Sequence, residues 1–501
     1  MRSSTGALLA ASALVLACAQ IRPTDQETAG RSADRVAGLY LRHCAACHGV
    51  TGEADGPLAA WIHPPPRPFA DGVFSIVSTD NGIPSDADLA TTIEGGLPGT
   101  GMPGFGWIAK VDLAGLARHV RKIAIEGRAH FSRLLAEHEG RPFDESTLFA
   151  RAEAALAPGI PMPELPEATL TPELLERGRQ LFRVACAACH GEDGRGRPLA
   201  REWRARFDVR LPRDFTGGVL RGGTSAAAIQ HRIESGMPAA GMPALRIEGA
   251  DMQAVVAYVR SLIPEAVRLE RPAQPQRVLA ARRARILSDP NDAAWKPVRI
   301  QLWPLRGELD TAAQAWMAAV HDGRELAVMI RWSDATRDSS QANAPAPDAV
   351  AVQISPDAEP PFLAMGSAEN AVHIWQWQAF AATDTKGVTD LVTSPLRDLT
   401  DAGPGAMPRQ RMRAITGKAK GRDSMPEFAS AGKPIALSQE WKDGTWSIVF
   451  RRELVPSDRR EVTLRPGEAI RFALAIWNGS AGQRGANKSI SAWHTLEFAD
   501  R

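Results

Sequence analysis

The hexapeptide CAACHG occurs twice in the 501-residue chain, at 44–49 and, without a single change, at 186–191. The two copies contain four of the five cysteines. Cys-x-x-Cys-His is the attachment sequence of a c-type haem, in which two thiols one helical turn apart bond to the porphyrin and the histidine faces the iron. The repeat therefore predicts two covalent haem c groups, held by Cys44, Cys47, Cys186 and Cys189, with His48 and His190 as axial iron ligands.

Two other uses of paired cysteines fit the sequence less well. A zinc site would want a second pair of ligands at metal spacing, and neither unit contains another cysteine. A redox dithiol does not use an adjacent histidine and occurs in a βαβ pattern, which is absent from the sequence. Covalent haem is the interpretation that uses both cysteines and the histidine of each motif.

The repetition extends beyond the hexapeptide. An aromatic residue, Tyr40 or Phe182, lies four positions before each first cysteine, which places ring and thiol on one helix face. Downstream, the segment 93–106 parallels 233–245, and each unit then closes on a helical pattern. We expect two copies of a small all-α domain of roughly ninety residues. Both copies resemble class I cytochrome c domains.

The second axial ligand of each iron is expected from a Gly-Met-Pro loop. Aligning the two units places Met102 opposite Met242, whereas Met237 falls opposite Leu97. A thioether is a soft ligand that raises the reduction potential, which suits an electron carrier. The alternative is that these methionines only fill gaps in the core, as methionine commonly does. Met237 is the reserve ligand of the second haem.

Two arginines are candidate partners of haem propionates. Arg67 and Arg213 precede Phe69 and Phe215 by two residues in parallel segments of the two units. A solvated arginine is the alternative for each of them. Three further histidines have no ligand spacing and are expected on the surface: His43, His63 and His119.

The N-terminal stretch MRSSTGALLAASALVLAC predicts an export signal. A basic residue precedes an apolar run too short to span a bilayer as a helix. The sequence VLAC resembles a bacterial lipobox, so Cys18 is the predicted lipidation site and residues 1–17 the signal peptide. An ordinary cleaved signal with an incidental cysteine is the alternative. We therefore expect an exported, periplasmic protein anchored to the membrane as a lipoprotein.

From about residue 290 the sequence changes to short alternating strands separated by Gly, Pro, Asp and Asn. This pattern is typical of an all-β antiparallel sandwich or barrel. Ten of the thirteen tryptophans lie in this half, which contains no cysteine and therefore no covalent haem. No Ser-His-Asp, phosphate-loop or His-Glu-x-x-His pattern is present. From the residues alone, this half is a tryptophan-rich binding module.

Four segments of this half resemble one known family: 294–305, 320–338, 362–377 and 476–498. The family comprises the haem b-binding γ subunits of ethylbenzene dehydrogenase and of related dimethyl sulfide, selenate and chlorate oxidoreductases. The resemblance implies a β-sandwich that holds one non-covalent haem b between a methionine and a lysine, which fall on Met365 and Lys488. His494 shares the parity of Lys488 in a single predicted strand and is the rival ligand.

The expected fold is thus multidomain, with two small all-α cytochrome c domains followed by an all-β antiparallel sandwich. The predicted boundaries are 1–17 for the signal peptide, 32–126 for the first cytochrome c domain, 127–170 for a helical and Pro-rich linker, 171–264 for the second cytochrome c domain, 265–289 for a further linker and 290–501 for the haem b-binding domain.

Three haems with both axial positions filled predict an electron relay rather than an enzyme that transforms a substrate. The resemblance implies a molybdopterin-containing catalytic subunit of the dimethyl sulfoxide reductase class and an iron–sulfur subunit as partners, with other redox carriers beyond them. A net charge of +2 gives no indication of a nucleic-acid partner. Two alternatives are a dihaem cytochrome c fused to a ligand- or sugar-binding sandwich, and an oxidoreductase with a labile haem site.

Overall fold

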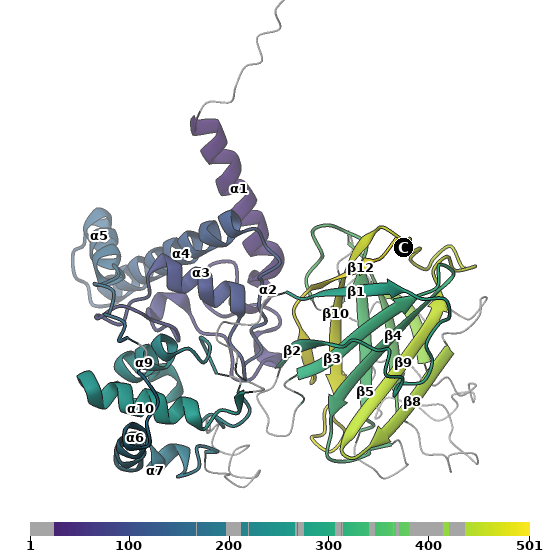
Figure 1. The fold of residues 1–501 in the computed structure, drawn as a ribbon. Helices are drawn as coiled ribbons and strands as arrows, with labels where there is room; N and C mark the ends of the chain where they lie inside the picture. Colours follow the sequence, from purple (N-terminus) through teal and green to yellow (C-terminus); the bar gives the residue numbers. More distant parts are fainter. Residues whose placement is uncertain are drawn as a thin grey trace, which may run out of the picture.

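The protein is described from a computed structural model. The structure describes residues 25–166, 168–196, 212–218, 220–265, 268, 275–305, 312, 314–339, 346–363, 365–366, 370–379, 414–419 and 436–500. Figure 1 shows a helical part that faces a β-sheet, with the first helices nearer the sheet than α6 and α7. Within the described ranges, every helix is too short or too polar to traverse a bilayer.

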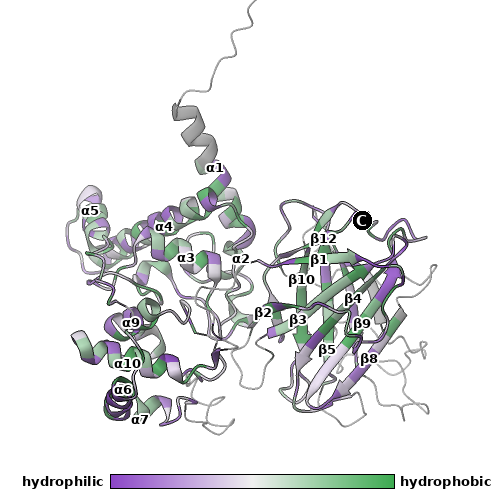
Figure 2. Cartoon of the chain, in the orientation of Figure 1, coloured by the Kyte–Doolittle hydropathy of each residue, from purple (hydrophilic) through white to green (hydrophobic). Residues whose placement is uncertain are grey.

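The first helical unit contains seven helical elements: α1 (Asp25–His43), α2 (Ala45–His48), η1 (Ala59–Trp61), η2 (Phe69–Asp71), α3 (Asp86–Gly95), α4 (Lys110–His138) and α5 (Glu145–Ala155). Helix α3 begins at a capping box, in which Ser85 and Asp88 each satisfy a backbone N–H of the other. Helices α1 and α4 pack through Tyr40, Leu113 and Leu116, which are all buried. The mixed colours of these helices in Figure 2 are those expected of helices with one buried face.

Helix α4 continues through position 126, where the sequence analysis places a domain boundary. Gly127 lies inside this helix. Its missing side chain lets the helix pass close to η2, since a Cβ there would lie 3.0 Å from the Cβ of Ala70. The end of α4 then packs on α5 through Ala124, Ala152 and Leu156. The predicted helical linker is in this way packed onto the first unit.

The second helical unit repeats the plan of the first: α6 (Pro172–Ala185), α7 (Ala187–His190), α9 (Ala226–Ser235), η3 (Pro238–Ala240) and α10 (Gly249–Ser261). Thr171 caps α6 by accepting a hydrogen bond from the N–H of Leu174, with Pro172 at the first helical position. Gly178 allows α6 and α10 to cross closely, since a Cβ there would lie 2.0 Å from the carbonyl oxygen of Ala254.

The C-terminal half forms a sheet whose strands are β1 (Arg277–Arg282), β2 (Val298–Pro304), β3 (Gln314–His321), β4 (Glu325–Ser333), β5 (Ala349–Ser355), β6 (Val372–Gln378), β7 (Ala414–Ala419), β8 (Ala436–Lys442), β9 (Thr445–Glu453), β10 (Ala469–Trp477), β11 (Ser489–Ser491) and β12 (His494–Phe498). Their order is β7-β6-β5-β10-β11-β2-β3-β4-β9-β8, with β1 beside β12 and β3. All described pairings are antiparallel except those of β1, which are parallel. The predicted antiparallel sheet is therefore confirmed for every described strand except β1, which comes from the predicted linker at 265–289 and pairs in parallel.

The sheet folds over so that its two halves enclose one core. Alternate residues of β4 and β9 meet those of β5 and β10 in this core. Its centre is a group of three buried tryptophans, Trp332, Trp377 and Trp446, whose ring centroids lie 4.9–6.2 Å apart. The indole N–H of Trp446 donates to the carboxylate of Asp348 at 3.0 Å. Aromatic rings thus fill the interior of this half.

Candidate functional site

The first Cys-x-x-Cys-His motif lies on one helical turn directly after α1. The N–H of Cys44 donates to the carbonyl of Tyr40 at 2.8 Å, and the N–H of His48 to the carbonyl of Cys44 at 2.9 Å. Gly49 ends the turn with a φ of +78°, and its carbonyl accepts a 2.7 Å hydrogen bond from the Tyr40 hydroxyl. Both thiols and the imidazole are in this way set on a rigid turn.

A phenylalanine orients the imidazole of this motif. The rings of His48 and Phe69 are stacked, with centroids 4.8 Å apart. Phe69 is held in turn because its N–H donates to the carbonyl of Gly52 at 2.8 Å, and a side chain at Gly52 would strike its ring. The sequence analysis used Phe69 only to place Arg67; the parallel segments in the two units were the signal for its role.

The second motif has the same geometry. The N–H of Cys186 donates to the carbonyl of Phe182 at 2.8 Å, and Gly191 ends the turn with a φ of +74°. The ring of His190 is stacked on Phe215 with centroids 4.7 Å apart. The two predicted attachment turns are therefore structural repeats as well as sequence repeats.

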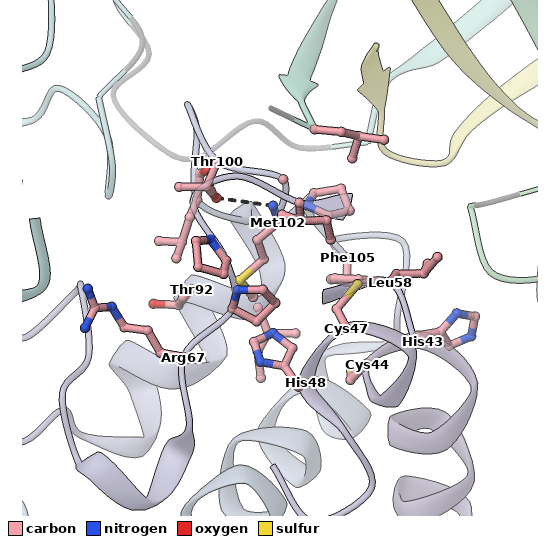
Figure 3. A pocket seen from close by; sticks show the side chains of 18 of the residues that line it. His43, Cys44, Cys47, His48, Leu58, Arg67, Thr92, Thr100, Met102 and Phe105 are labelled. Carbon is pink, nitrogen blue, oxygen red and sulfur yellow. Dashed lines mark hydrogen bonds between the residues drawn. The ribbon is translucent and has the colours of Figure 1, made fainter. Parts of the chain in front are cut away.

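Met102 lies on the loop between α3 and α4, opposite the first motif. The hydroxyl of Thr100 accepts a 3.2 Å hydrogen bond from the N–H of Met102 and donates a 2.7 Å bond to the carbonyl of Leu97. The hydrogen bond between Thr100 and Met102 is drawn in Figure 3. In the same view, the sulfur of Met102 and the ring of His48 point toward one another beside Cys47. A sulfur and an imidazole nitrogen that face each other across a gap are placed as two axial ligands of one iron would be.

The equivalent loop of the second unit places Met242 at the position of Met102. The N–H of Leu97 donates to the carbonyl of Met102 at 3.0 Å, and the N–H of Met237 to that of Met242 at 2.8 Å. The structure thus reproduces the alignment of the two loops. Met237 is buried, whereas Met242 is half-buried and packs on the core of the second unit. In this unit, residues 197–211, between α7 and α9, lie outside the described residues.

Burial keeps the ligand groups of the first motif uncharged. It lowers the pKa of His48 to about 4, so the imidazole is neutral at pH 7 and its nitrogen lone pair is available to a metal. Burial and, to a smaller extent, the charge of the nearby Cys47 raise the pKa of Cys44 to about 12. These side chains are poor candidates for acid–base catalysis and good ones for holding an apolar group.

A cavity of about 290 Å³ separates His48 from Met102 and is lined mainly by apolar side chains. Arg67 also lines it, but its guanidinium points away from the Met102 sulfur in Figure 3. The guanidinium of Arg213 is not at the second motif: it donates to the carbonyl of Pro98 at 3.1 Å, in the loop that leads to Met102.

One histidine prediction is wrong. His43 was expected on the surface but is only 3% exposed, because its ring packs against Trp107 with centroids 4.9 Å apart. No spacing in the sequence indicates this contact, which depends on the fold. His63 is exposed as expected, and His119 is half-buried against Tyr40.

The predicted haem b ligands line the same cavity. Met365 and Lys488 both face it, as do Leu363 and Ile490. These four residues also line a smaller pocket of about 40 Å³ that continues toward β10. Met365 and Lys488, which are more than a hundred positions apart in the sequence, therefore line the same cavity.

The turn that carries Met365 is unusual. Met365 has a φ of +76°, a left-handed conformation that side chains other than glycine rarely adopt. Gly366 has the same φ, and a Cβ there would lie 2.7 Å from the carbonyl oxygen of Asn370. Such conformations persist only where the surroundings impose them, and they cluster at ligand sites. This turn directs the Met365 side chain into the cluster of Trp477 and Trp493.

Lys488 lies against an aromatic ring rather than a carboxylate. Its Nζ is 4.9 Å from the ring centroid of Trp477, and no carboxylate of the described residues forms an ion pair with it. Burial lowers the pKa of Lys488 to about 8. A larger fraction of its amine is therefore neutral near pH 7 than for an exposed lysine, and a neutral amine can bind a metal.

His494 does not share the face of Lys488. Ile490 pairs with Ala475 on the face of β10 that lines the cavity, whereas His494 pairs with Phe472 on the face that points into the core. The predicted single strand is broken between β11 and β12, and this break reverses the alternation. The Nδ1 of His494 accepts a 2.8 Å hydrogen bond from the N–H of Gln276 instead.

The tryptophans of the C-terminal half are core residues. Eight of the ten are buried, and the other two, Trp316 and Trp441, are half-buried. A sugar-binding platform needs exposed aromatic rings, so the described surface offers little for that alternative. Cys18 and the predicted signal peptide lie outside the described residues.

Comparisons with known proteins agree with this division of the chain. Residues 31–120 match the family model of cytochrome c oxidase, cbb3-type, subunit III, and residues 175–262 match that of cytochrome c. Residues 312–489 match the ethylbenzene dehydrogenase model. The predicted resemblance is thereby confirmed: two cytochrome c regions precede a region of the ethylbenzene dehydrogenase type. The cytochrome c matches imply haem c.

Two relatives are similar over about a third of the chain. A protein named as a respiratory nitrate reductase haem subunit, from Haloferax mediterranei, is 28% identical over 179 residues, which are 34% of this chain and 51% of that protein. The γ subunit of dimethylsulfide dehydrogenase from Rhodovulum sulfidophilum is 27% identical over 33% of this chain and 52% of its own. The chain thus spans about half the length of the relatives it matches.

Solved structures are more distant. A reducing HAO-like protein complex from Kuenenia stuttgartiensis has a TM-score of 0.35 at 22% identity, over 46% of this chain and 96% of its own. A family 9 carbohydrate-binding module from Caldicellulosiruptor kristjanssonii has a TM-score of 0.24 at 10% identity, over 45% and 97%. Both TM-scores are too low to carry an argument about function.

Proposed function

We propose that this chain is a three-haem electron-transfer subunit with two covalent haem c groups and one non-covalent haem b. The single observation that carries the proposal is the arrangement in the first unit. There the ring of His48 faces the sulfur of Met102 across an apolar cavity, beside the two thiols of Cys44 and Cys47. The second unit repeats the same turn and loop.

In each cytochrome unit, two thiols would hold the haem and two side chains would bind its iron. His48 and Met102 serve the first unit, and His190 with Met242 the second. Haem supplies one-electron chemistry when bound. The chain contributes the neutral imidazole, the soft sulfur and an apolar wall that excludes water, and these features favour the reduced metal and raise the reduction potential.

In the C-terminal domain, Met365 and Lys488 would be the axial ligands of haem b. The strained turn at Met365 and the half-buried amine of Lys488 support this assignment. No described cysteine lies in this half, so the haem would be held by coordination and apolar contact alone. The folded-over sheet would then be the haem-holding sandwich of residues 290–501, after cytochrome domains at 32–126 and 171–264.

The partners are inferred from the relatives. One relative is named as the haem subunit of a nitrate reductase and another as the γ subunit of a dehydrogenase. We infer that this chain passes electrons between a molybdenum oxidoreductase of the dimethyl sulfoxide reductase class, through an iron–sulfur subunit, and respiratory carriers. Co-purification with a molybdopterin-containing subunit from the native cell checks this, and complexes without molybdenum would contradict it.

The protein is inferred to act outside the cytoplasm, attached to a membrane through lipidated Cys18. Covalent haem attachment at Cys-x-x-Cys-His supports an exported location. Cys18→Ser should then release the protein from the membrane fraction while it is still exported. A wild-type protein that is soluble and begins beyond residue 18 would reject the lipid anchor.

Haem stoichiometry tests the proposed function directly. Acid–acetone extraction followed by pyridine haemochrome spectra should give two covalent haems and one extractable haem per chain. Met365→Ala and Lys488→Ala should each lose the extractable haem and retain both covalent ones. Two covalent haems and no extractable haem in the wild type would instead favour a dihaem cytochrome fused to a binding module.

A further inference from the structure

The wall of the C-terminal haem site is completed by a different domain. The cavity that contains Met365 and Lys488 also contains Cys44, Cys47 and Met102 of the first cytochrome unit. These two sites fall in separately matched regions of the chain. One continuous cavity means that the two sets of ligands are not separated by a layer of protein.

An apolar contact joins the two domains. Trp107 of the first unit packs on the core of its own domain and also on the cluster around Met365 and Trp477. The N–H of His63 also donates to the carbonyl of Leu305, which lines the cavity, at 2.9 Å, and this bond joins the first unit to the end of β2. The contact therefore combines a shared aromatic ring with a backbone hydrogen bond across the interface.

Two ion pairs hold the same interface at its edge. Glu359, on the loop before Met365, accepts from Arg35 at 2.7 Å and from Arg42 at 3.1 Å, both on α1. The three side chains are 44–50% exposed, so each pair contributes little by itself. None of the three lines the cavity. They can consequently be changed without touching a ligand.

The second cytochrome unit has a different position. Of its described residues, Arg221 alone reaches this cavity, and none of Cys186, Cys189 and His190 lines it. The second unit instead rests on the first, where Arg213 donates to the carbonyl of Pro98. The first unit thus contacts both other domains.

We propose that the first cytochrome domain closes the haem b site, so that its haem c and the haem b share one cavity. The charge of each haem then changes the reduction potential of the other. The ion pairs of Glu359 hold the two domains together. This inference rests on the proposed function, because it presumes that Met365 and Lys488 hold a haem. It adds that the two neighbouring centres are those of the first unit and the C-terminal domain. It also gives the order of the three sites as second unit, first unit, C-terminal domain.

The internal repeat provides a matched control for the test. In the full chain, Cys44→Ala with Cys47→Ala removes the first covalent haem, and Cys186→Ala with Cys189→Ala removes the second. The midpoint potential of the extractable haem is then measured by spectroelectrochemical titration. It should shift in the first variant, since a neighbouring charge that changes with oxidation state is lost at short range, and stay unchanged in the second.

A second pair of variants covers the case in which the first does not fold. Met102→His and Met242→His should keep all haems and lower the potential of one covalent centre each. Only Met102→His should alter the titration curve of the extractable haem, because only that centre is its neighbour. Equal curves for the extractable haem in both variants of either pair would overturn the proposal.

Haem release tests the closure itself. Glu359→Arg places a third positive charge beside Arg35 and Arg42, and should speed transfer of the extractable haem to apomyoglobin by about five-fold, as expected for losing partly exposed ion pairs. Glu359→Arg combined with Arg42→Glu should restore most of the wild-type rate. Unchanged release in Glu359→Arg would reject Glu359 as the fastening. Absence of extractable haem from the wild type would instead overturn the proposed function itself.

Discussion

Replacing Lys488 by methionine should stabilise the protein while removing one of the two proposed ligands of haem b. Burial lowers the pKa of Lys488 from 10.5 to about 8. Because the folded state disfavours the charged amine, the wild type is penalised at every pH below about 8. The penalty is lost as the pH rises from about 8 to 10.5, where the unfolded chain also gives up its proton.

The size of the effect follows from that shift. A lowering from 10.5 to about 8 corresponds to roughly 3 kcal/mol at 1.36 kcal/mol per pKa unit. The Nζ also gains from the Trp477 ring 4.9 Å away, a contact of about 1 kcal/mol that methionine partly replaces. We expect Lys488→Met to raise the free energy of unfolding at pH 7 by about 2 kcal/mol and by much less at pH 10.5.

The assay is urea unfolding of the full chain, followed by tryptophan fluorescence at pH 7 and pH 10.5. The dissociable haem is first transferred to excess apomyoglobin, so that ligand binding does not contribute. Lys442, exposed at the end of β8, provides the control, and Lys442→Met should change neither stability nor its pH dependence. Equal stability of wild type and Lys488→Met at pH 7 would refute the reasoning and mean that the amine is hydrated.

Three further predictions concern other sites. Burial raises the pKa of Asp334 to about 7, so the wild type loses stability as the pH rises from about 4 to 7. Asp334→Asn should therefore raise the melting temperature at pH 8 and leave it unchanged at pH 4. EDTA is present in this measurement because Asp334, Asp338 and Asp348 lie close enough together to bind a metal ion. Met242→His should lower the potential of one covalent haem, and the same shift from Met237→His instead would mean that Met237 is the ligand. Tyr40→Phe loses the 2.7 Å hydrogen bond to the Gly49 carbonyl and should destabilise the first cytochrome unit by about 1–2 kcal/mol. The thermal change in haem absorbance measures this effect. The second unit, which has Phe182 at the equivalent position, is the internal reference.

The sequence predicted the parts of this protein that repeat or that follow a local period. The two attachment turns and the pairing of Met102 with Met242 could be read from identical letters at equal spacing. The short strands after residue 290 followed from alternation and turn residues, because a sheet with one buried face imposes a period of two.

What failed depended on contacts between distant segments. His494 was expected beside Lys488, yet a two-residue break between β11 and β12 turns it to the opposite face. Nothing local in the sequence marks that break, since both sides alternate normally. His43 was expected on the surface and is buried by Trp107, more than sixty residues away. The parallel position of β1 likewise depends on the completed sheet.

The joining of the first cytochrome unit and the sheet in one chain has a kinetic consequence. For two separate proteins, a contact made by Arg35, Arg42 and Glu359 would weaken with dilution and with salt, which screens exposed charges. A covalent linker replaces the partner's concentration by an effective concentration on the order of millimolar. The rate of electron exchange between the proposed haem c of the first unit and the proposed haem b should therefore be first order in protein. Its rate constant should be independent of dilution and only weakly sensitive to ionic strength. Only the encounters with external partners remain bimolecular.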